Sequence, residues 1–326
     1  MKDRIESIAE AIRNSSRVII STHKAPEGDA IGSMLALLIA LRDMGKVCHA
    51  VLSDDVPACL KFLPLADQIQ QEAEGPLSKY DLGLIVDCTD PGRAGIASSA
   101  IAEIPKVVNI DHHRTNSRFG DIHLVDENAS ATGELVCRVL KAVPSEISPQ
   151  IATAIFTAVI TDTGSFHFSN STPESFHVAG EMVACGAIPS EIANQVFVSR
   201  SPAGLQLLGL VLSTLEFVED DRIGSAVVLR EMIREVRGNR EMIEGVIDHI
   251  RAVRGVDVAI LFGELGEGIF KVSFRSKGNL DVAAVASKFG GGGHKNAAGC
   301  MMYGSLEKIM YTVHQEVRRI VKGTNA

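Results

Sequence analysis

The chain carries at residues 18–45 the stretch VIISTHKAPEGDAIGSMLALLIALRDMG, which predicts a strand, a polar loop and a helix in direct succession. The strand is the apolar run 18–20, which leads directly to His23. The helix covers residues 30–44, where apolar residues recur with helical spacing, and it ends at Gly45, a common C-terminal cap. A strand followed at once by a helix is the repeating unit of a parallel α/β sheet.

Further apolar runs at residues 47–52, 82–86 and 107–110 predict additional strands, and helical patterns are interleaved with them. This alternation favours a mainly parallel, five-stranded-type sheet flanked by helices on both faces. Ligands of such sheets bind beyond the carboxyl ends of the strands. Polar residues that follow different strands are therefore expected to meet at one edge, even when they lie far apart in the sequence.

Acidic and imidazole side chains form four clusters, each at the end of an apolar run. The clusters are His23, Glu27 and Asp29; Asp87; Asp111, His112 and His113; and Asp162. Mixed carboxylate and imidazole ligands suit manganese, iron or zinc more than calcium. Because the ligands suffice for two ions, the pattern predicts a two-metal hydrolase.

Each of these residues also has a purely structural explanation when it is taken alone. Asp29 precedes the predicted helix and would cap it well, and a lone Asp87 at a strand end is most often a turn residue. The adjacent His112 and His113 cannot point the same way on an extended chain, so we expect one to bind metal and the other to face the substrate. Asp111 then orients an imidazole or holds the backbone. The four clusters together favour the metal site.

A glycine run, residues 290–293, is followed by His294, Lys295 and Asn296. Taken alone, such a run is most often a flexible loop. Because glycine has no side chain, however, the backbone N–H groups of the run can approach an anion closely. Arg275 can donate two parallel hydrogen bonds to a phosphate. The predicted substrate-binding residues are Arg93, Arg275, Ser276, Gly291, Gly292, Gly293, His294, Lys295 and Asn296.

With these motifs the chain resembles the DHH phosphoesterase superfamily. In the first half, the resemblance is carried by the run from His23 to Ser33 and by the acidic and imidazole clusters that follow it. The run from Phe289 to Gly299 is similar to the glycine-rich signature of the DHH-associated C-terminal domain. The match covers nearly the whole chain. Its length and layout are most similar to the bacterial nanoRNase/pAp phosphatase branch.

The resemblance implies two manganese ions, with Mg²⁺ or Co²⁺ as alternatives. It assigns one ion to His23 and Glu27, the other to Asp29, His112 and Asp162, and a bridging position to Asp87. It gives catalytic roles to His113, Asp87 and Asp111, with His113 contacting the scissile phosphate.

Glu27 is a departure from the resembling family, which usually has Asp at this position. Glutamate keeps the carboxylate but is one methylene longer. The expected consequence is an altered metal preference with activity retained.

The 326 residues are enough for about two domains. The predicted division is a DHH catalytic metal-binding domain at residues 1–195, a helical linker at 196–217 and a smaller α/β substrate-binding domain at 218–326, with the active-site cleft between the domains. Homodimers are common in the resembling branch. The apolar stretch 207–215 would support a dimer or pack between the domains.

The composition disfavours some classes of partner. The net charge of −8 and the absence of Trp argue against a protein that coats long nucleic acid. No apolar run approaches the roughly 18 residues of a membrane span, and the N-terminus lacks a signal pattern. The six scattered cysteines indicate buried thiols in a reducing compartment, so we expect a cytoplasmic protein without a membrane partner.

The motifs and the resemblance together predict a manganese-dependent phosphoesterase. It would degrade short oligonucleotides (nanoRNA and dinucleotides) to 5′-mononucleotides and also act as a 3′-phosphatase on pAp. The open alternatives are a cyclic or linear di-AMP phosphodiesterase and a phosphoanhydride hydrolase, such as a pyrophosphatase or an exopolyphosphatase. A non-catalytic nucleotide sensor is a further alternative, in which Glu27 marks a weakened metal site.

Overall fold

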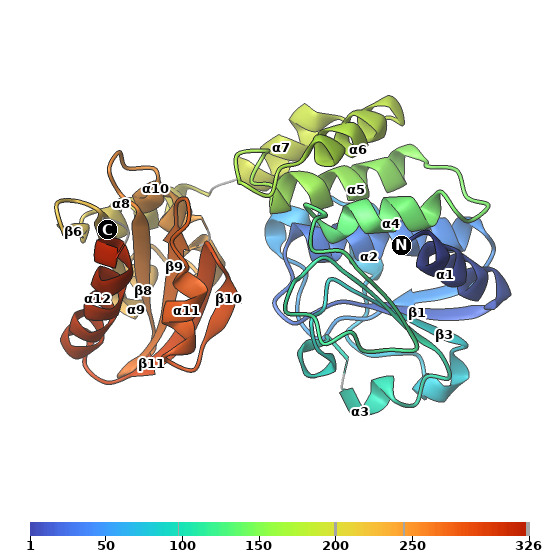
Figure 1. The fold of residues 1–326 in the computed structure, drawn as a ribbon, viewed down its shortest axis with the longest axis horizontal. Coiled ribbons are helices and arrows are strands. Elements are labelled where there is room, and N and C mark those ends of the chain that lie inside the picture. The colour runs from blue at the N-terminus through green and yellow to red at the C-terminus, as the bar shows by residue number, and fades with distance from the viewer. Residues whose placement is uncertain (97, 199–200, 244, 324–326) are drawn as a thin grey trace. The chain divides into compact units, whose positions relative to one another are not determined.

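The computed structural model describes residues 1–96, 98–198, 201–243 and 245–323, without the side chains of Ser98 and His294. The chain forms two compact units, the N-terminal unit Met1–Ser199 and the C-terminal unit Arg200–Ala326 (Figure 1). The domain boundaries at residues 195 and 217, and the dimer, stay predictions. Within the described ranges, no helix is both long enough and apolar enough to cross a membrane.

The N-terminal unit is built on a five-stranded sheet in which all neighbouring strands are parallel, in the order β2-β1-β3-β4-β5. The strands are β1 Arg17–Ser21, β2 Val47–Ala50, β3 Leu82–Val86, β4 Val107–Asp111 and β5 Ile122–Val125. The predicted parallel α/β architecture is therefore confirmed. Strand β3 is buried along its whole length, as expected for a central strand that is covered on both faces.

Seven α-helices of the N-terminal unit can be described, and four one-turn 3₁₀ helices accompany them. The α-helices are α1 Lys2–Asn14, α2 Gly28–Asp43, α3 Ser98–Ile101, α4 Thr132–Leu140, α5 Pro149–Asp162, α6 Pro173–Ala184 and α7 Pro189–Phe197. The 3₁₀ helices are η1 Ala58–Leu60, η2 Ala66–Gln68, η3 Leu77–Lys79 and η4 Pro91–Arg93. The apolar runs of the sequence did not predict β5, α6 or α7.

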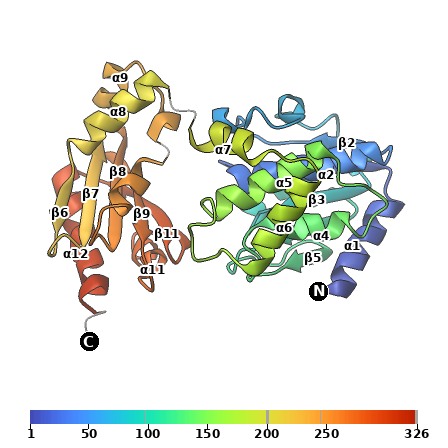
Figure 2. The ribbon, with the colours of Figure 1, turned by 90° about the horizontal axis from the view of Figure 1, so that it is seen from above.

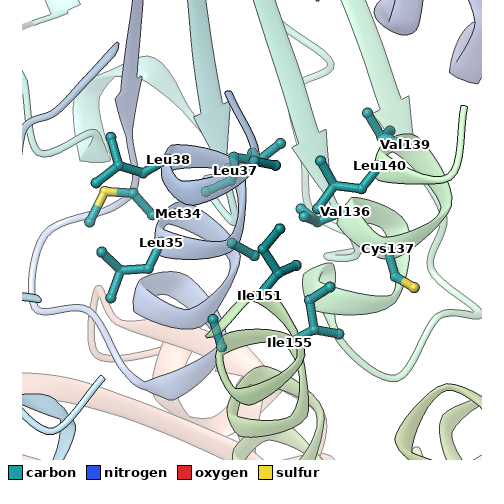
Figure 3. Packing of buried hydrophobic residues seen from close by; sticks show 14 of the residues in the cluster. Met34, Leu35, Leu37, Leu38, Val136, Cys137, Val139, Leu140, Ile151 and Ile155 are labelled. Atoms are coloured by element: carbon teal, nitrogen blue, oxygen red, sulfur yellow. The ribbon is translucent and has the colours of Figure 1, made fainter. Parts of the chain in front are cut away.

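The helices cover the two faces of the sheet unequally. Helices α2 and α4 pack on one face of the sheet. Helix α5 packs against these two helices, and α6 lies outside α5 (Figures 1 and 2). Figure 3 shows Leu37 of α2, Val136 of α4 and Ile155 of α5 in this apolar cluster. The opposite face is covered by short segments, including η3 and α3. Ile19 and Ile85 of the strands point to that face.

Two glycines allow α2 to approach α5 closely. A Cβ at Gly28 would lie 2.4 Å from the side chain of Thr161, and a Cβ at Gly32 would lie 2.5 Å from the carbonyl oxygen of Ala154. Any larger residue at either position would force the two helices apart. This close approach brings the first turn of α2 to the last turn of α5, where two acidic residues of the predicted site lie.

The C-terminal unit contains a six-stranded mixed sheet in the order β10-β11-β9-β8-β7-β6, in which β7 and β8 are parallel and the other pairs are antiparallel. Its strands are β6 Glu216–Val218, β7 Ile223–Val228, β8 Val258–Gly266, β9 Ile269–Ser276, β10 Gly292–His294 and β11 Ala297–Tyr303. Its helices are α8 Pro202–Leu212, α9 Arg230–Glu235, η5 Arg240–Ile243, α10 Val246–Arg251, α11 Val282–Ser287 and α12 Leu306–Lys322. Helices α11 and α12 pack on one face of the sheet, and α8 and α10 pack on the other.

The apolar stretch that was expected to link the domains belongs to the core of the C-terminal unit. Its helix is α8, and the buried side chains of Leu207, Leu208 and Val211 pack against β7 and β8. The helix ends at Leu212, so the expectation that it continues to Phe217 is wrong, because Phe217 lies in β6 and pairs with β7. Three buried leucine and valine side chains inside this unit are not available for a dimer contact.

Candidate metal centre

The acidic and imidazole clusters of the sequence meet at the carboxyl edge of the N-terminal sheet. His23 follows β1, Asp87 follows β3, and Asp111 is the last residue of β4. Two helices deliver the remaining acids, because Asp29 lies in the first turn of α2 and Asp162 is the last residue of α5. Residues separated by more than a hundred positions therefore share one site, as the parallel topology requires.

One group of candidate ligands consists of His23, Glu27 and Asp87, whose ligand atoms all lie within 4.8 Å of one another. The Nε2 atom of His23 is 3.1 Å from Oε1 of Glu27 and 3.5 Å from Oδ2 of Asp87. His23 and Asp87 are buried, whereas the side chain of Glu27 is 47% exposed. This group is open to solvent on the Glu27 side.

A second group consists of Asp29, His112 and Asp162, again with ligand atoms within 4.8 Å of one another. The Nε2 atom of His112 lies 3.8 Å from Oδ2 of Asp29 and 3.6 Å from Oδ2 of Asp162. Asp29 is fully buried. The two groups contain the residues that the sequence assigned to two ions, and that assignment stays a prediction.

Asp87 lies between the two groups. Its Oδ2 faces His23 at 3.5 Å, and its Oδ1 lies 3.9 Å from Nε2 of His112 and 3.5 Å from Nδ1 of His113. The residue has a positive φ of 51°, a conformation that Asp tolerates better than most residues do. Oδ2 is buried and has no hydrogen-bond partner within the described part of the chain. A buried carboxylate oxygen without a donor is costly, and a cation beside it would remove that cost.

Backbone contacts set the tautomers of both candidate imidazole ligands. Nδ1 of His23 lies 2.9 Å from the carbonyl oxygen of Lys24, and Nδ1 of His112 lies 3.1 Å from the carbonyl oxygen of Ala129. A carbonyl oxygen can only accept, so in each ring Nδ1 carries the proton. The neutral ring then presents the lone pair of Nε2 to the carboxylates, which is the usual arrangement of a metal-binding histidine.

His113 is held differently from its neighbour. Its Nδ1 lies 2.7 Å from Oδ1 of Asp111, which also accepts the backbone N–H groups of His112 and His113 at 2.8 and 3.2 Å. The other oxygen of Asp111 accepts the side-chain amide of Asn116 at 2.5 Å. Asp111 therefore fixes the ring of His113 and the backbone around both histidines, in line with the orienting role expected for it.

The site holds more acids than bases. Its five carboxylates are those of Glu27, Asp29, Asp87, Asp111 and Asp162, and its three imidazoles are those of His23, His112 and His113. With all five carboxylates ionised, the cluster would keep an excess of negative charge even with every imidazole protonated. Like charges this close and this buried repel strongly in the absence of cations.

This crowding shifts the pKa values of the site. Burial would lower the pKa of His23, but Asp87 and Glu27 outweigh that effect and raise the pKa to about 11. Burial also opposes the charge on His112, but nearby carboxylates, led by Asp162, raise its pKa to about 9. Burial raises the pKa of Asp162 to about 6. Protons thus hold the acids together here, and divalent cations would displace them.

The donor set fits divalent cations. Carboxylate and imidazole donors in two adjacent groups, with a shared aspartate between them, match the requirements of a two-metal site for a divalent first-row ion such as Mn²⁺. Oδ2 of Asp87 accepts no hydrogen bond within the described ranges, and a cation would supply the positive charge that this buried oxygen lacks.

Two polar residues that the sequence did not single out contact the candidate ligands. Thr132, the first residue of α4, donates its hydroxyl to Oδ1 of Asp87 at 2.9 Å and its N–H to Oδ2 of Asp29 at 2.6 Å. Asn170 donates its amide to Oδ2 of Asp162 at 3.2 Å and to the carbonyl oxygen of Ser130 at 3.0 Å. A single Thr or Asn in a sequence carries no spacing signal that could have identified it.

Arg93, predicted to bind substrate, lies next to the loop of His23. Its carbonyl oxygen accepts the N–H of Lys24 at 2.8 Å, and the following Ala94 forms a bridge with His23. The side chain of Arg93 is exposed at the end of η4. The structure therefore places this cation near the metal centre without a contact to its ligands.

The remaining predicted substrate residues gather in the C-terminal unit. Arg275 is half-buried on β9, opposite Ala297 of β11, and burial lowers its pKa. Ser276 is buried and donates its hydroxyl to the carbonyl oxygen of Leu280 at 2.7 Å. The amide of Asn296 donates to that hydroxyl at 2.9 Å. Ser276 and Asn296 thus stabilise the loop that follows β9. This structural role is additional to the substrate binding that the sequence predicts for them.

The glycine run has two different tasks. A Cβ at Gly291 would lie 2.2 Å from the carbonyl oxygen of Gly299, and Gly293 combines a φ of 143° with a Cβ position 2.5 Å from the carbonyl oxygen of Ala297. These two glycines are required by the hairpin itself. Gly292 pairs with Gly299 in the hairpin and has open space at its Cβ position, which leaves room for a ligand on that side. Lys295 is exposed, and the side chain of His294, also predicted, lies outside the described residues.

Comparison with known proteins identifies related sequences over both units. Residues 17–159 match the DHH family, N-terminal domain, and residues 224–322 match the DHHA1 domain. A protein of Thermus thermophilus named bifunctional oligoribonuclease and PAP phosphatase NrnA is 34% identical over 327 residues, covering 97% of this chain and 95% of its own.

Solved structures share the fold. A Bacteroides fragilis protein described as exopolyphosphatase-related has a TM-score of 0.92 and 26% identity, and the match covers 98% of this chain and 96% of that one. The structure of RecJ from Thermus thermophilus in complex with Mn²⁺ has a TM-score of 0.54 and 15% identity, covering 97% of this chain and 53% of RecJ. The RecJ match, at that identity, shows likeness of fold alone.

Proposed function

Because the chain belongs to the DHH family of phosphoesterases, we propose that it degrades short oligonucleotides to 5′-mononucleotides with two manganese ions, and that it also removes the 3′-phosphate of pAp. The chain is a hydrolase of phosphate esters. The narrower substrate class rests on one observation above the others. The Thermus thermophilus oligoribonuclease and PAP phosphatase matches almost the full length of both chains.

The candidate metal centre supports a phosphoester chemistry. When bound, two divalent cations supply Lewis acidity and lower the pKa of a water molecule. His23, Glu27, Asp29, His112 and Asp162 would hold these cations from two sides. Asp87 lies between the groups and would serve both. Manganese is the proposed ion because the donors are of mixed carboxylate and imidazole type, and because a RecJ protein of this fold binds it.

His113 is the proposed contact to the scissile phosphate. Oδ1 of Asp111 accepts a hydrogen bond from Nδ1 of His113 at 2.7 Å. This hydrogen bond fixes the orientation of the ring and favours the protonated imidazole. Burial would lower the pKa of His113, but Asp111 and Asp87 raise it. A protonated imidazole beside the phosphate stabilises the negative charge that develops on its oxygens in the transition state. The positioning of His113 by Asp111 is thus the protein's own contribution to the reaction.

The residues of the C-terminal unit would bind the far end of the substrate. Arg275 suits a phosphate through two parallel N–H donors, and the open space beside Gly292 leaves room for a second anion contact. Lys295 adds positive charge. Two phosphate contacts of this kind would suit a short chain or a mononucleotide with an extra phosphate. The net charge of −8 agrees with local binding in preference to binding of long nucleic acid.

A substrate panel in manganese tests the proposal. It contains a dinucleotide, a pentanucleotide, a 24-mer, pAp, cyclic di-AMP and pyrophosphate, and chromatography resolves the products. We expect rapid conversion of the short oligomers to 5′-mononucleotides, slow turnover of the 24-mer and phosphate release from pAp. An Asp87→Asn protein is the matched control for contaminating nucleases.

Other outcomes of the panel select the alternatives. Cyclic di-AMP turned over faster than any linear oligomer would identify a cyclic dinucleotide phosphodiesterase. Turnover of pyrophosphate alone would identify a phosphoanhydride hydrolase. Nucleotide binding without turnover of any substrate would favour a sensor in which Glu27 weakens the metal centre.

A further inference from the structure

We propose that Thr132 is a positioning residue, which holds the two candidate ligands Asp29 and Asp87 in the relative position that two divalent cations need. The proposal rests on the proposed function only in requiring that the cluster binds divalent cations. It adds a residue that the spacing of the sequence does not single out.

Thr132 contacts both carboxylates at once. Its hydroxyl donates to Oδ1 of Asp87 at 2.9 Å, and its backbone N–H donates to Oδ2 of Asp29 at 2.6 Å. Thr132, Asp29 and Asp87 are all at most 1% exposed. The acids come from different elements, the first turn of α2 and the end of β3. Thr132 therefore links two parts of the chain that share no sequence neighbourhood.

Capping of its own helix does not explain the Thr132 hydroxyl. Helix α4 has Ala131 at its N-cap position, which offers no side-chain oxygen. Instead, the carboxylate of Asp29 accepts the N–H groups of Thr132 and Gly133 at 2.6 and 2.9 Å, so α4 is capped from α2. The Thr132 hydroxyl is directed to Asp87 and makes no contribution to this cap.

The segment around Thr132 is itself firmly held. The buried carboxylate of Glu134 accepts both the N–H and the hydroxyl of Ser130, and Arg138 lies 3.5 Å from the other Glu134 oxygen. The carbonyl oxygen of Ala129 accepts Nδ1 of His112. Residues 129–134 thus touch three candidate ligands from one rigid turn, and Thr132 is the contact to Asp87.

The hydroxyl matters because of what surrounds the Asp87 carboxylate. Oδ2 of Asp87 has no hydrogen-bond partner among the described residues, whereas Oδ1 accepts the Thr132 hydroxyl. Without it, Oδ1 would lose the hydroxyl donor that helps to fix the rotation of this buried carboxylate. Asp29 would keep its backbone donors in any Thr132 variant. Removal of the hydroxyl therefore isolates the effect on Asp87.

A pair of substitutions separates positioning from packing. Thr132→Val keeps the branched shape and removes the donor, whereas Thr132→Ser keeps the donor and removes a methyl group. Thr157→Val is the matched control, because Thr157 is equally buried and its hydroxyl donates to the carbonyl oxygen of Thr153 within α5. Mn²⁺ binding is measured by titration calorimetry on metal-stripped protein without substrate. Thermal unfolding of the metal-stripped proteins reports on the fold.

We expect Thr132→Val to weaken Mn²⁺ binding by about 10- to 100-fold, the usual effect of losing a residue that orients a ligand. Thr132→Ser and Thr157→Val should bind Mn²⁺ within about threefold of the unmodified protein. Unmodified Mn²⁺ affinity in Thr132→Val would overturn the proposal. So would equal losses in the Val and Ser variants, because these would indicate packing, and so would an unmodified protein that binds no Mn²⁺.

The binding measurement is independent of the substrate. A protein that hydrolyses no oligonucleotide, but loses Mn²⁺ affinity in Thr132→Val alone, would refute the proposed function and support the positioning role. Normal turnover of short oligomers, with unmodified Mn²⁺ affinity in Thr132→Val, would support the proposed function and refute the positioning role.

Discussion

Oε1 of Glu27 lies 3.1 Å from Nε2 of His23, so the longer acidic side chain reaches the imidazole that it is predicted to share an ion with. Glu27 is half exposed, while His23 is buried. The extra methylene therefore does not carry the carboxylate out of the site. Glu27 is therefore the candidate ligand of this group that lies closest to solvent.

Substitutions at Glu27 should separate charge from length. Glu27→Gln removes the negative charge at nearly constant shape, and we expect it to weaken the first Mn²⁺ site by at least about tenfold, with a matching loss of turnover. Glu27→Asp keeps the charge and should retain turnover within about tenfold while changing the relative activities in Mn²⁺, Mg²⁺ and Co²⁺. Calorimetry and steady-state rates in each metal provide the measurement. Equal behaviour of the Gln variant and the unmodified protein would remove Glu27 from the ligand set.

Asp87 should be the most sensitive acid of the site. Asp87→Asn keeps the shape, the tolerance of a φ of 51° and an acceptor for the Thr132 hydroxyl, but it removes the charge that would serve both ions. We expect turnover to fall by at least about a thousandfold, with loss of at least one bound Mn²⁺.

Circular dichroism and thermal unfolding of Asp87→Asn should show an intact fold. Metal analysis by mass spectrometry then gives the stoichiometry. Two bound ions and turnover within tenfold of the unmodified protein would contradict the bridging assignment.

The sequence was sufficient to predict where the ligands gather. The strands that lead to His23, Asp87 and Asp111 are short and continuously apolar, and parallel strands bring their carboxyl ends to one edge. The pattern failed at β5, a four-residue edge strand in which three residues are only half buried and no apolar run develops. A strand this short and this partly buried has too few apolar residues for its sequence pattern to predict it.

The contacts that orient the ligands could not be predicted. Thr132 meets Asp29, 103 residues earlier in the chain, because α4 packs against α2. Gly133 allows α4 to approach α5 as well, since a Cβ there would lie 2.5 Å from the Cβ of Ala158 in α5. Such a pair depends on how helices dock, and a lone threonine or glycine in a sequence does not reveal it. The internal hydrogen bonds of Ser276 and Asn296 were missed because they depend on how β9 pairs with β11.

Arg275 should act on substrate binding in preference to chemistry. Arg275→Ala removes a half-buried guanidinium whose Nη1 donates to the carbonyl oxygen of Phe274. We expect KM for a dinucleotide to rise by about 10- to 100-fold with kcat within about threefold, since a group that binds the substrate without taking part in the chemistry contributes uniform binding. Arg275→Lys should recover part of the loss because it keeps the charge but not the fork.

The control for Arg275 is Arg254→Ala, which removes an exposed arginine of the same unit. It should leave both kinetic constants unchanged. A collapse of kcat alone in Arg275→Ala would contradict its role as an anchor for the distal phosphate.

Asp81 provides a pH-dependent test of the N-terminal fold away from the metal centre. Its Oδ2 accepts the N–H groups of Ser16 and Arg17 at 2.7 and 2.8 Å, which ties the start of β1 to the start of β3. These two backbone hydrogen bonds lower the pKa of Asp81. A carboxyl whose pKa is lower in the folded state stabilises the fold above its unfolded pKa of about 3.9, and this stabilisation disappears as the pH falls through the folded value.

Asp81→Ala should therefore reduce the free energy of unfolding by about 1 kcal/mol near neutral pH, a modest value because Asp81 is exposed to solvent. The difference from the unmodified protein should shrink steadily as the pH falls below about 4. Urea unfolding of metal-stripped protein between about pH 7 and pH 3 provides the measurement, because chelation removes the contribution of the metal centre. Glu10→Ala, which removes an exposed acid on α1, should show no such pH-dependent difference. A constant Asp81→Ala effect across this range would mean that the contact stabilises the strands through its shape and not through its charge.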